Sequence, residues 1–342
     1  MAFRLSPLAR RRWAAFRANR RGWVSLWLFV ALFVLSLGAE FLANDRPIFI
    51  WYAEKAYWPV FQDYPETEFG GFFPTTAVYT DPEVQALIEE QGWMLWPPVR
   101  FRFDTLNKNL SSPPPTPPSA TNLLGTDDHG RDILARCIYG FRISVLFGLT
   151  LTLISSVIGV AAGAVQGYYG GVLDLCFQRF LEVWSGLPVL FLLIILANIV
   201  TPNFWWLLGI MLLFSWMSLV DLVRAEFLRG RNLEYVRAAK ALGRTDAAIM
   251  RIHILPNAMV STITYLPFIL VGGITTLTSL DFLGFGLPPG SPSLGELLAQ
   301  GKNNPNAPWI GLAGFCVLGG TLALLVFMGE AARDAFDPRR QR

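Results

Sequence analysis

The sequence has few charged residues, few cysteines and few histidines for its length of 342 residues. Charged residues make up 15% of the chain, whereas about 25% is usual in a soluble globular protein. The three cysteines, Cys137, Cys176 and Cys316, lie far apart, so they suggest neither a disulfide framework nor a zinc site. A content of 53% hydrophobic residues excludes a disordered chain and a nucleic-acid-binding chain, and it is typical of a membrane protein.

A phosphate-binding loop is also missing from the sequence. The glycine pairs Gly70-Gly71 and Gly319-Gly320 lack the lysine and the Ser or Thr that such a loop requires. We therefore expect any nucleotide hydrolysis to belong to another chain. We do not expect this chain to be an enzyme by itself. We also expect it to contain no catalytic, cofactor-binding or metal-binding residues.

Long uncharged windows predict an all-α polytopic membrane protein. A bilayer core needs about 20 apolar helical residues. The windows are Gly22 to Ala39, Ile143 to Gly163, Val183 to Val220, Ala258 to Leu280 and Trp309 to Gly329. The first is too long for the apolar region of a cleaved signal peptide, so we expect an uncleaved span over 22–43.

The third window is too long for one span. As a helix it would measure about 57 Å, nearly twice the bilayer core. Thr201, Pro202 and Asn203 lie at its middle and favour a turn, which predicts two antiparallel spans. Six transmembrane helices in total place both chain ends on one side of the membrane.

Arginine and lysine positions predict the orientation of these helices. Residues 1–21 contain seven arginines and no acidic residue, residues 221–257 contain seven basic residues, and the tail 331–342 contains four. The segment 281–308 contains only one. Because basic loops stay in the cytoplasm, we expect both termini and the loop 221–257 to be cytoplasmic.

The segment 44–123 is the one large hydrophilic part, and we call it the insert. From Asp45 onward it holds ten acidic residues against five basic ones, and it is rich in aromatic residues. We expect it outside the cytoplasm as a small domain that ends in a stiff proline-rich linker, Ser111 to Ser119. A short helix is predicted over Asp81 to Gln91, and the remaining five spans lie in the core 124–330.

The loop segment Asn232 to Asn257 reads NLEYVRAAKALGRTDAAIMRIHILPN. Asn232 suits a helix N-cap and Gly243 suits a C-terminal stop, so one short amphipathic helix is predicted between them. A second helical piece is expected from Thr245 toward Pro256. Periodicity alone leaves open that the loop is only a connector lying on the membrane face.

This loop resembles the cytoplasmic signature of importer-type ABC transporter permeases. In that family two alanines are followed after three residues by glycine, and later by a Leu-Pro pair. The matching residues are Ala238, Ala239, Gly243, Leu255 and Pro256. The general pattern has Glu and Ile where this chain has Arg237 and His253, but the peptide-importer branch is similar to EYVRAA and HILPN.

Further stretches resemble the same branch. They are Leu124 to Leu149, the GYYGG of Gly167 to Gly171, the FLGFG of Phe282 to Gly286, and the RDAFDPR of Arg333 to Arg339. The resemblance covers about 220 residues from Leu123 onward, plus the first span. The long acidic insert is a feature in which this chain resembles the Yej-type permeases, which are associated with peptide and microcin C import.

The resemblance implies the type I ABC importer permease fold and a role in peptide import across the bacterial inner membrane. It also implies a second homologous permease, cytoplasmic ATPase subunits that hold ATP and Mg²⁺, a periplasmic solute-binding protein and surrounding lipid. The residues expected to contact the ATPase are Glu234, Tyr235, Ala238, Ala239, Leu242, Gly243, Leu255 and Pro256.

Other functions remain alternatives at this point. A permease of the same family for another solute, such as nickel chelates, is one. A secondary carrier or a membrane-embedded enzyme is less favoured, because such proteins place charged residues inside their spans and the predicted windows have none.

Two further features have both a functional and a structural interpretation. The cluster Asp127, Asp128, His129, Arg131 and Asp132 suits a cation or proton site, but acidic clusters at a membrane edge are usually solvated. The family resemblance favours a structural role, with Arg136 and Arg142 neutralising the acids. Pro188 and Pro267 fall inside predicted spans, where proline marks a helix kink, a gate or a simple packing bend.

Overall fold

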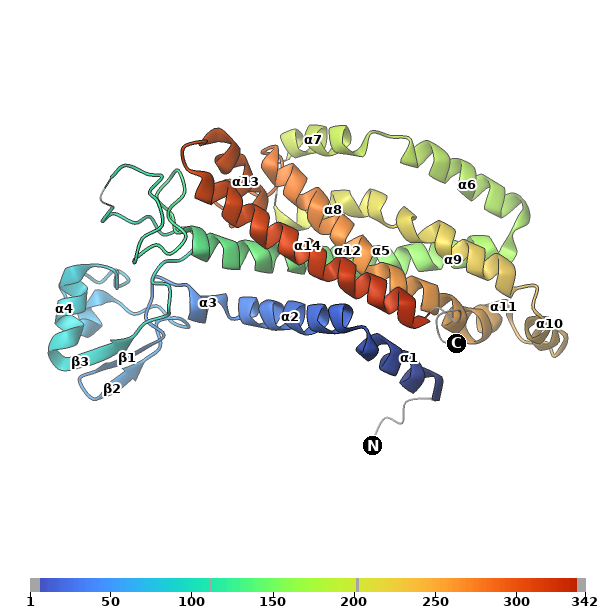
Figure 1. Cartoon of the computed structure of the whole chain (residues 1–342), viewed down its shortest axis with the longest axis horizontal. Helices are drawn as coiled ribbons and strands as arrows, with labels where there is room; N and C mark the ends of the chain where they lie inside the picture. The colour runs from blue at the N-terminus through green and yellow to red at the C-terminus, as the bar shows by residue number, and fades with distance from the viewer. Residues whose placement is uncertain (1–6, 111, 201–202, 337–342) are drawn as a thin grey trace. The chain divides into compact units, whose positions relative to one another are not determined.

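The computed structural model describes residues 7–110, 112–200 and 203–336, most of which are helical (Figure 1). Four sequence predictions fall partly outside these ranges: the start of the N-terminal tail, Ser111 of the linker, Thr201 and Pro202 of the predicted turn, and the C-terminal tail beyond Phe336. The helices are α1 (Pro7–Ala18), α2 (Arg20–Leu37), α3 (Ala39–Leu42), α4 (Pro82–Gln91), α5 (Ile133–Tyr169), α6 (Gly171–Ser185), α7 (Val189–Ile199), α8 (Phe204–Ser215), α9 (Met217–Gly230), α10 (Glu234–Ala241), α11 (Asp246–Ala248), α12 (Leu255–Phe282), α13 (Leu294–Asn303) and α14 (Pro308–Phe336).

A 3-10 turn, η1, covers Glu66–Phe69, and a π-helical segment, η2, covers Ile249–Ile254. Three short strands are β1 (Phe49–Tyr52), β2 (Lys55–Tyr57) and β3 (Gly92–Leu95). Contacts divide the chain into two compact units. The first contains the described residues of 1–31, 145–288 and 319–342, and the second contains 32–144 and 289–318.

The structure confirms an all-α polytopic architecture for the apolar part of the chain. Among the described residues, five stretches are long and apolar enough to cross a bilayer: Arg20–Leu37, Ile133–Tyr169, Phe204–Gly230, Asp246–Phe282 and Pro308–Phe336. Helices α6 and α7 supply a sixth if they count as one span, although they are bent by 67° at their junction.

The helical region at the third predicted span starts earlier than predicted. We expected it to begin at Val183, but α6 begins at Gly171, where Gly170 and Gly171 both have positive φ and turn the chain after α5. Asp174 and Glu182 lie within α6. These charges hid the helix from a search for uncharged windows.

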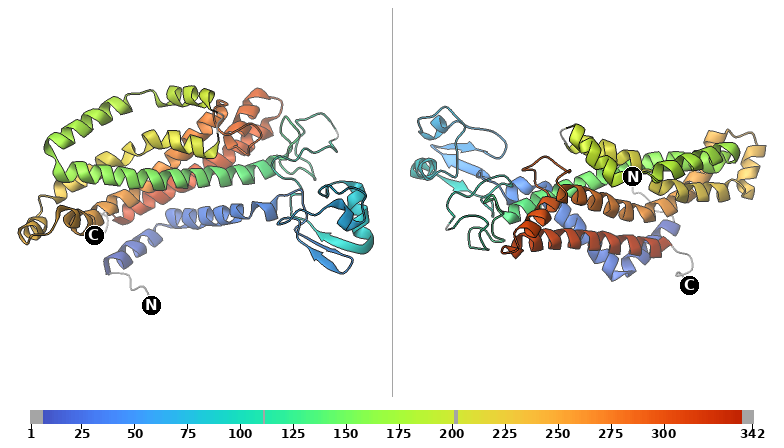
Figure 2. Two further views of the ribbon diagram at one scale, coloured as in Figure 1. Left: turned by 180° about the vertical axis from the view of Figure 1, so that it is seen from behind. Right: turned by 90° about the horizontal axis from the view of Figure 1, so that it is seen from above.

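The two prolines lie in different surroundings. Pro188 lies at the bend between α6 and α7, directly before the first residue of α7. Pro267 lies inside α12, which continues through it without interruption. A β-carbon at Gly329 of α14 would come within 3.3 Å of Pro267, so the two helices are in close contact here, and Figures 1 and 2 show them side by side. Gating by either proline stays a prediction.

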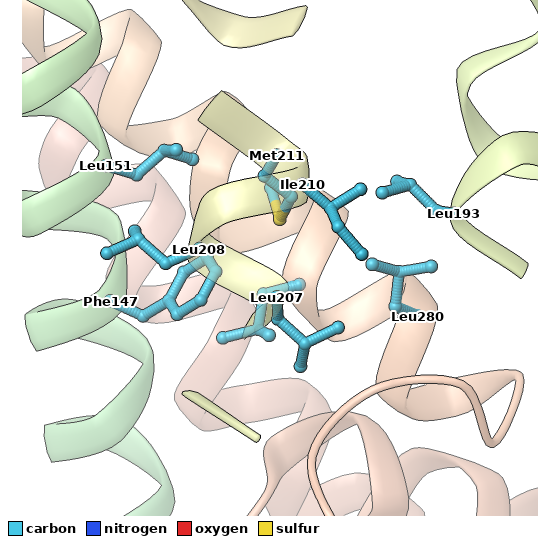
Figure 3. Packing of buried hydrophobic residues seen from close by; sticks show 9 residues of the cluster. Phe147, Leu151, Leu193, Leu207, Leu208, Ile210, Met211 and Leu280 are labelled. Carbon is cyan, nitrogen blue, oxygen red and sulfur yellow. The ribbon is translucent and has the colours of Figure 1, made fainter. Parts of the chain in front are cut away.

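An apolar core holds α5, α7, α8 and α12 together in the first unit (Figure 3). Its buried members are Phe147, Leu151, Leu193, Leu207, Leu208, Ile210, Met211, Leu277 and Leu280. The side chains interdigitate between the helices, and the Phe147 ring meets the Phe204 ring edge to face at 5.3 Å. Asn203 caps α8 by accepting a hydrogen bond from the Trp206 amide at 2.9 Å.

Three glycines let α5 approach the Trp216–Phe227 stretch at backbone distance. Gly159, Gly163 and Gly167 recur every fourth residue and therefore lie on one side of α5. A β-carbon at any of them would lie 2.5–2.6 Å from a backbone carbonyl oxygen of the Trp216–Phe227 stretch. Small residues at such spacing are the usual means of close helix packing in membranes.

The second unit contains the insert, which folds into more than the predicted helix. Helix α4 is confirmed over Pro82–Gln91, with Asp81 accepting a hydrogen bond from the Glu83 amide at 3.0 Å as its N-cap. The strands form an antiparallel sheet in the order β2-β1-β3, which the sequence analysis did not predict. One sheet face, η1 and α4 enclose a small core centred on Phe69, Ile50 and Ile88.

We expect Gly163→Ala to destabilise the protein by about 1–3 kcal/mol, because its methyl group would overpack the contact with Val220 and Val223. Gly209→Ala is the matched control: it is also a glycine inside a helix, but no atom of the described chain lies within 4 Å of its added β-carbon. That change should be neutral or stabilising by about 0.5–1 kcal/mol. Thermal unfolding in detergent measures both, and equal unfolding temperatures would contradict close packing at Gly163.

Candidate functional site

Helix α10 has one buried and one exposed side. Val236 and Ala239 are buried, whereas Glu234, Tyr235 and Ala238 are exposed. The predicted N-cap was wrong, because the capping position is Leu233, which makes no side-chain cap. The Asn232 amide instead donates to the Leu228 carbonyl at 3.1 Å.

The end of α10 is as predicted. Gly243 has φ +75°, its amide donates to the Lys240 carbonyl at 3.0 Å, and the Arg244 amide donates to the Ala239 carbonyl at 3.2 Å. This pair of bonds is a Schellman motif, which satisfies the last carbonyls of a helix. Among the described residues no atom lies within 4 Å of a β-carbon placed at Gly243, so backbone conformation rather than space requires glycine.

The chain returns to helix directly after this turn. Thr245 caps α11 by accepting a hydrogen bond from the Ala248 amide, and α11 continues through η2 into α12. Pro256 is the second residue of α12, and because it has no amide hydrogen it cannot donate a hydrogen bond to the preceding turn. The predicted second helical piece is therefore present, with π geometry that frequently occurs at functional sites.

The buried side of α10 is part of a core shared with α9, η2 and α12. The buried members of this cluster are Tyr168, Val223, Phe227, Val236, Ala239, Ile249, Ile254 and Ala258. Polar contacts add to it: the Asn257 amide donates to the Tyr235 hydroxyl at 3.2 Å, and the Tyr168 hydroxyl donates to Asp246 at 2.6 Å. Helix α10 is thus fixed to the start of α12.

Six of the eight residues predicted to contact a partner lie at the surface. They are Glu234, Tyr235, Ala238, Leu242, Gly243 and Pro256, and Leu242 is 84% exposed. Leu255 is partly buried, and Ala239 is only 7% exposed beneath the helix. A larger side chain at position 239 would therefore disrupt the core before it met a partner.

An ion pair that the sequence analysis missed joins α6 to α9. The Arg224 guanidinium donates to both carboxylate oxygens of Asp174, at 2.5 and 2.7 Å. Gln178 follows on α6 and donates to Gln166 of α5 at 3.2 Å. The search for uncharged windows passed over the part of α6 that contains Asp174. It therefore gave no indication of an ion pair between α6 and α9.

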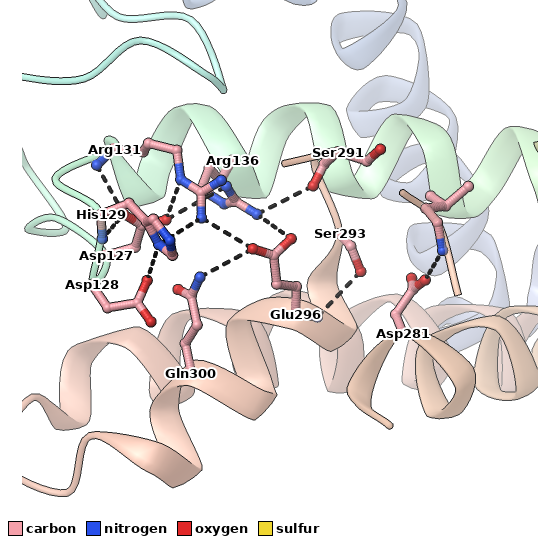
Figure 4. Close-up of polar contacts among 11 residues, drawn as sticks. Asp127, Asp128, His129, Arg131, Arg136, Asp281, Ser291, Ser293, Glu296 and Gln300 are labelled. Atoms are coloured by element: carbon pink, nitrogen blue, oxygen red, sulfur yellow. Dashed lines mark hydrogen bonds and ion pairs between the residues drawn. The ribbon is translucent and has the colours of Figure 1, made fainter. Parts of the chain in front are cut away.

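The polar cluster before α5 is an ion-pair network (Figure 4). Asp127 accepts from the Arg131 side chain at 2.6 Å, and Arg136 lies 3.5 Å from the same carboxylate. Glu296 of α13 accepts from Arg131 at 3.0 Å and from Arg136 at 2.8 Å. Arg136 is fully buried, so its charge depends on these two carboxylates for compensation.

This network supports the structural interpretation of the cluster. Ligand atoms of Asp127, Asp128 and His129 lie within 4.8 Å of one another, as a cation site would require. However, Asp127 also accepts from the amides of His129 and Arg131, both at 2.9 Å, so its oxygens are already engaged. Glu296 was not predicted as a partner, because it lies 165 and 160 positions from Arg131 and Arg136 in the sequence.

The predicted role of Arg142 was wrong. It donates to both oxygens of Glu40 at 2.9 Å and does not join the cluster, because it lies further along α5 and faces α3. Asp132 caps α5 by accepting from the Ala135 amide at 2.8 Å, and burial raises the pKa of its carboxyl. Thr116 of the proline-rich segment exchanges backbone and side-chain hydrogen bonds with Thr126.

We expect Glu296→Gln to lower stability by about 3–5 kcal/mol, since it leaves the buried Arg136 with less compensating charge. Asp128→Asn is the matched control, because its contact with His129 is exposed and should contribute less than about 1 kcal/mol. Thermal unfolding of both variants in detergent tests this. A calcium-dependent rise in the unfolding temperature that Asp128→Asn abolishes would instead indicate a cation site.

Comparison with known proteins shows the family to which this chain belongs. The model for the inner membrane component of binding-protein-dependent transport systems matches residues 155–342, more than half of the chain. The inner membrane ABC transporter permease YejE of Escherichia coli K12 is 60% identical over 337 residues, which cover 98% of this chain and 99% of that protein.

Two further relatives differ in how much of the chain they match. The peptidoglycan transport system permease YejE of Agrobacterium fabrum is 56% identical over 359 residues, covering 98% of this chain and 94% of that protein. The dipeptide permease DppC of Haemophilus influenzae is 37% identical over 219 residues, covering 64% of this chain and 74% of that protein. This chain therefore belongs to the inner membrane components of binding-protein-dependent transport systems, which are multi-pass permease subunits of ABC transporters.

Proposed function

We propose that this chain is one permease subunit of an ATP-driven peptide importer, with α10 as the helix that contacts a cytosolic ATPase. The observation that carries this proposal is the construction of α10. The exposed Ala238 has a small side chain, and the buried side of α10 shares a core with α9 and α12. A partner surface can approach the exposed side closely, and movement of α10 would carry the two membrane helices with it.

Peptide cargo is supported by the relatives. Two of their names refer to dipeptide and peptidoglycan transport. Peptides, peptidoglycan-derived peptides and peptide antibiotics such as microcin C share an amide backbone. Uptake of labelled members of each class distinguishes among them, and uptake of a nickel chelate in their place would favour the alternative solute.

The proposal includes the other subunits and the orientation. A second homologous permease pairs with this chain, a periplasmic binding protein delivers the cargo, and ATP and Mg²⁺ bind to the ATPase subunits. This chain itself is non-catalytic. The basic residues of the 221–257 loop favour a cytoplasmic α10, with both termini on the same side.

The packing of α10 against α9 and α12 would convert a displacement of α10 into a movement of these membrane helices. Closing of the ATPase subunits on nucleotide would displace α10, and the core around Phe227 and Ile254 resists separation of α10 from its neighbours. The displacement then becomes a rigid-body tilt of α9 and α12. Such a tilt is the step that would open the transport path alternately to the two sides.

We expect Ala238→Glu to reduce peptide uptake by about tenfold, equivalent to 1.4 kcal/mol of lost subunit contact, because it places a larger charged group in the contact with the ATPase. Uptake is measured in membranes that contain equal amounts of the assembled chain. Ala238→Ser is the matched control and should retain uptake. Wild-type uptake by Ala238→Glu would refute α10 as the contact.

A further inference from the structure

The small sheet of the insert has an apolar outer face. Directly opposite residues on antiparallel strands point to the same side, and the register pairs Trp51 with both Trp93 and Ala56, and Phe49 with Leu95. All five side chains are apolar. An antiparallel sheet with one solvated face normally carries polar residues there.

This outer face is both exposed and continuous. Trp93 is 53% exposed and Leu95 is 50% exposed. The Phe49 ring lies 5.3 Å from the Trp93 ring and 4.9 Å from the ring of Trp58, which directly follows β2. We call these residues, with Trp51 and Ala56, the aromatic face. Exposed apolar patches of this kind indicate a binding surface rather than a solvated one.

The aromatic face extends to the end of the first membrane helix. Phe61 follows Trp58 in a turn, in which its amide donates to the Trp58 carbonyl at 3.0 Å. The Phe61 ring, 71% exposed, contacts the Phe41 ring of α3 at 5.7 Å. Helix α3 follows α2 directly, and Leu35 near the end of α2 is also exposed, at 55%.

The acidic residues of α4 lie on the opposite side of the insert. Val84 and Ile88 of α4 pack against the inner sheet face, so the exposed Glu83, Glu89 and Glu90 point away from the sheet. The three glutamates of α4 and the rings of Trp51 and Trp93 therefore lie on opposite sides of the sheet. Tryptophan is enriched where a protein surface meets lipid headgroups, because its ring is apolar and its N–H is polar.

We propose that the aromatic face and Phe61 rest in the lipid headgroup region beside α2 and α3. The continuity of these rings with the end of a membrane helix identifies lipid as the occupant. The position of the carboxylates agrees, because they face water and stay clear of anionic lipid. This contact would fix the orientation of the insert at the membrane surface, and it does not depend on α10 or on the cargo.

Spin labels test the proposal on the full chain in nanodiscs of phosphatidylethanolamine and phosphatidylglycerol, without any other protein. The native cysteines are replaced by alanine, and a nitroxide is attached at Trp93→Cys or, in a second variant, at Trp51→Cys. Glu90→Cys on α4 is the matched control. Collisions with oxygen report lipid, and collisions with a water-soluble nickel complex report solvent.

The oxygen-to-nickel ratio should be several-fold higher at positions 93 and 51 than at position 90. Equal ratios at all three positions would overturn the proposal. A low ratio at position 93 that is accompanied by immobilisation only when a solute-binding protein is added would also overturn it, and would identify the aromatic face as a protein-docking surface.

Discussion

The attachment of α10 to the membrane helices depends on the apolar core beneath α10. Val236 and Ala239 are enclosed by residues of α9, η2 and α12, and small side chains make that enclosure possible. Close-packed interiors resist gradual deformation, so elements that share such a core move together. Without this core, α10 would be connected to α12 mainly by exposed polar contacts such as that between Asn257 and Tyr235.

Backbone-level contacts extend this rigid region to α5 and α6. The glycine side of α5 packs against backbone of α9, and the Asp174–Arg224 pair joins α9 to α6. Both side chains are largely shielded from water, so removing one partner would leave the other charge without compensation. The bend at Pro188 separates α6 from α7, and α7 then joins the apolar core of the first unit through Leu193.

Local rules predicted the local features. Asp81 before a proline marked the start of α4, Gly243 marked the end of α10, and uncharged windows located the apolar helices. The misses involve residues far apart in the chain. Glu296 pairs with Arg131 and Arg136 across more than 150 positions, which no spacing reveals. The strands were missed because each is four residues or shorter and becomes stable only by pairing.

In the second unit, the buried ion pairs and the exposed aromatic side chains lie in different places. The buried Arg136 joins α5 to α13 through Glu296, whereas Trp51 and Trp93 of the insert lie exposed on one sheet face. Long relatives of the YejE type match nearly the whole chain, and DppC matches about two thirds of it. The insert is therefore a feature that the chain shares with its longer relatives.

The central claim is that α10 and α12 move as one body. It is tested by the distance between nitroxides attached at Arg237→Cys on α10 and Ile263→Cys on α12, measured by pulsed electron resonance in the assembled transporter. The account predicts one narrow distance distribution that stays unchanged when ATP binds and is hydrolysed, while transport proceeds. A distribution that shifts or broadens with nucleotide would show that α10 moves separately from α12, and would contradict the account.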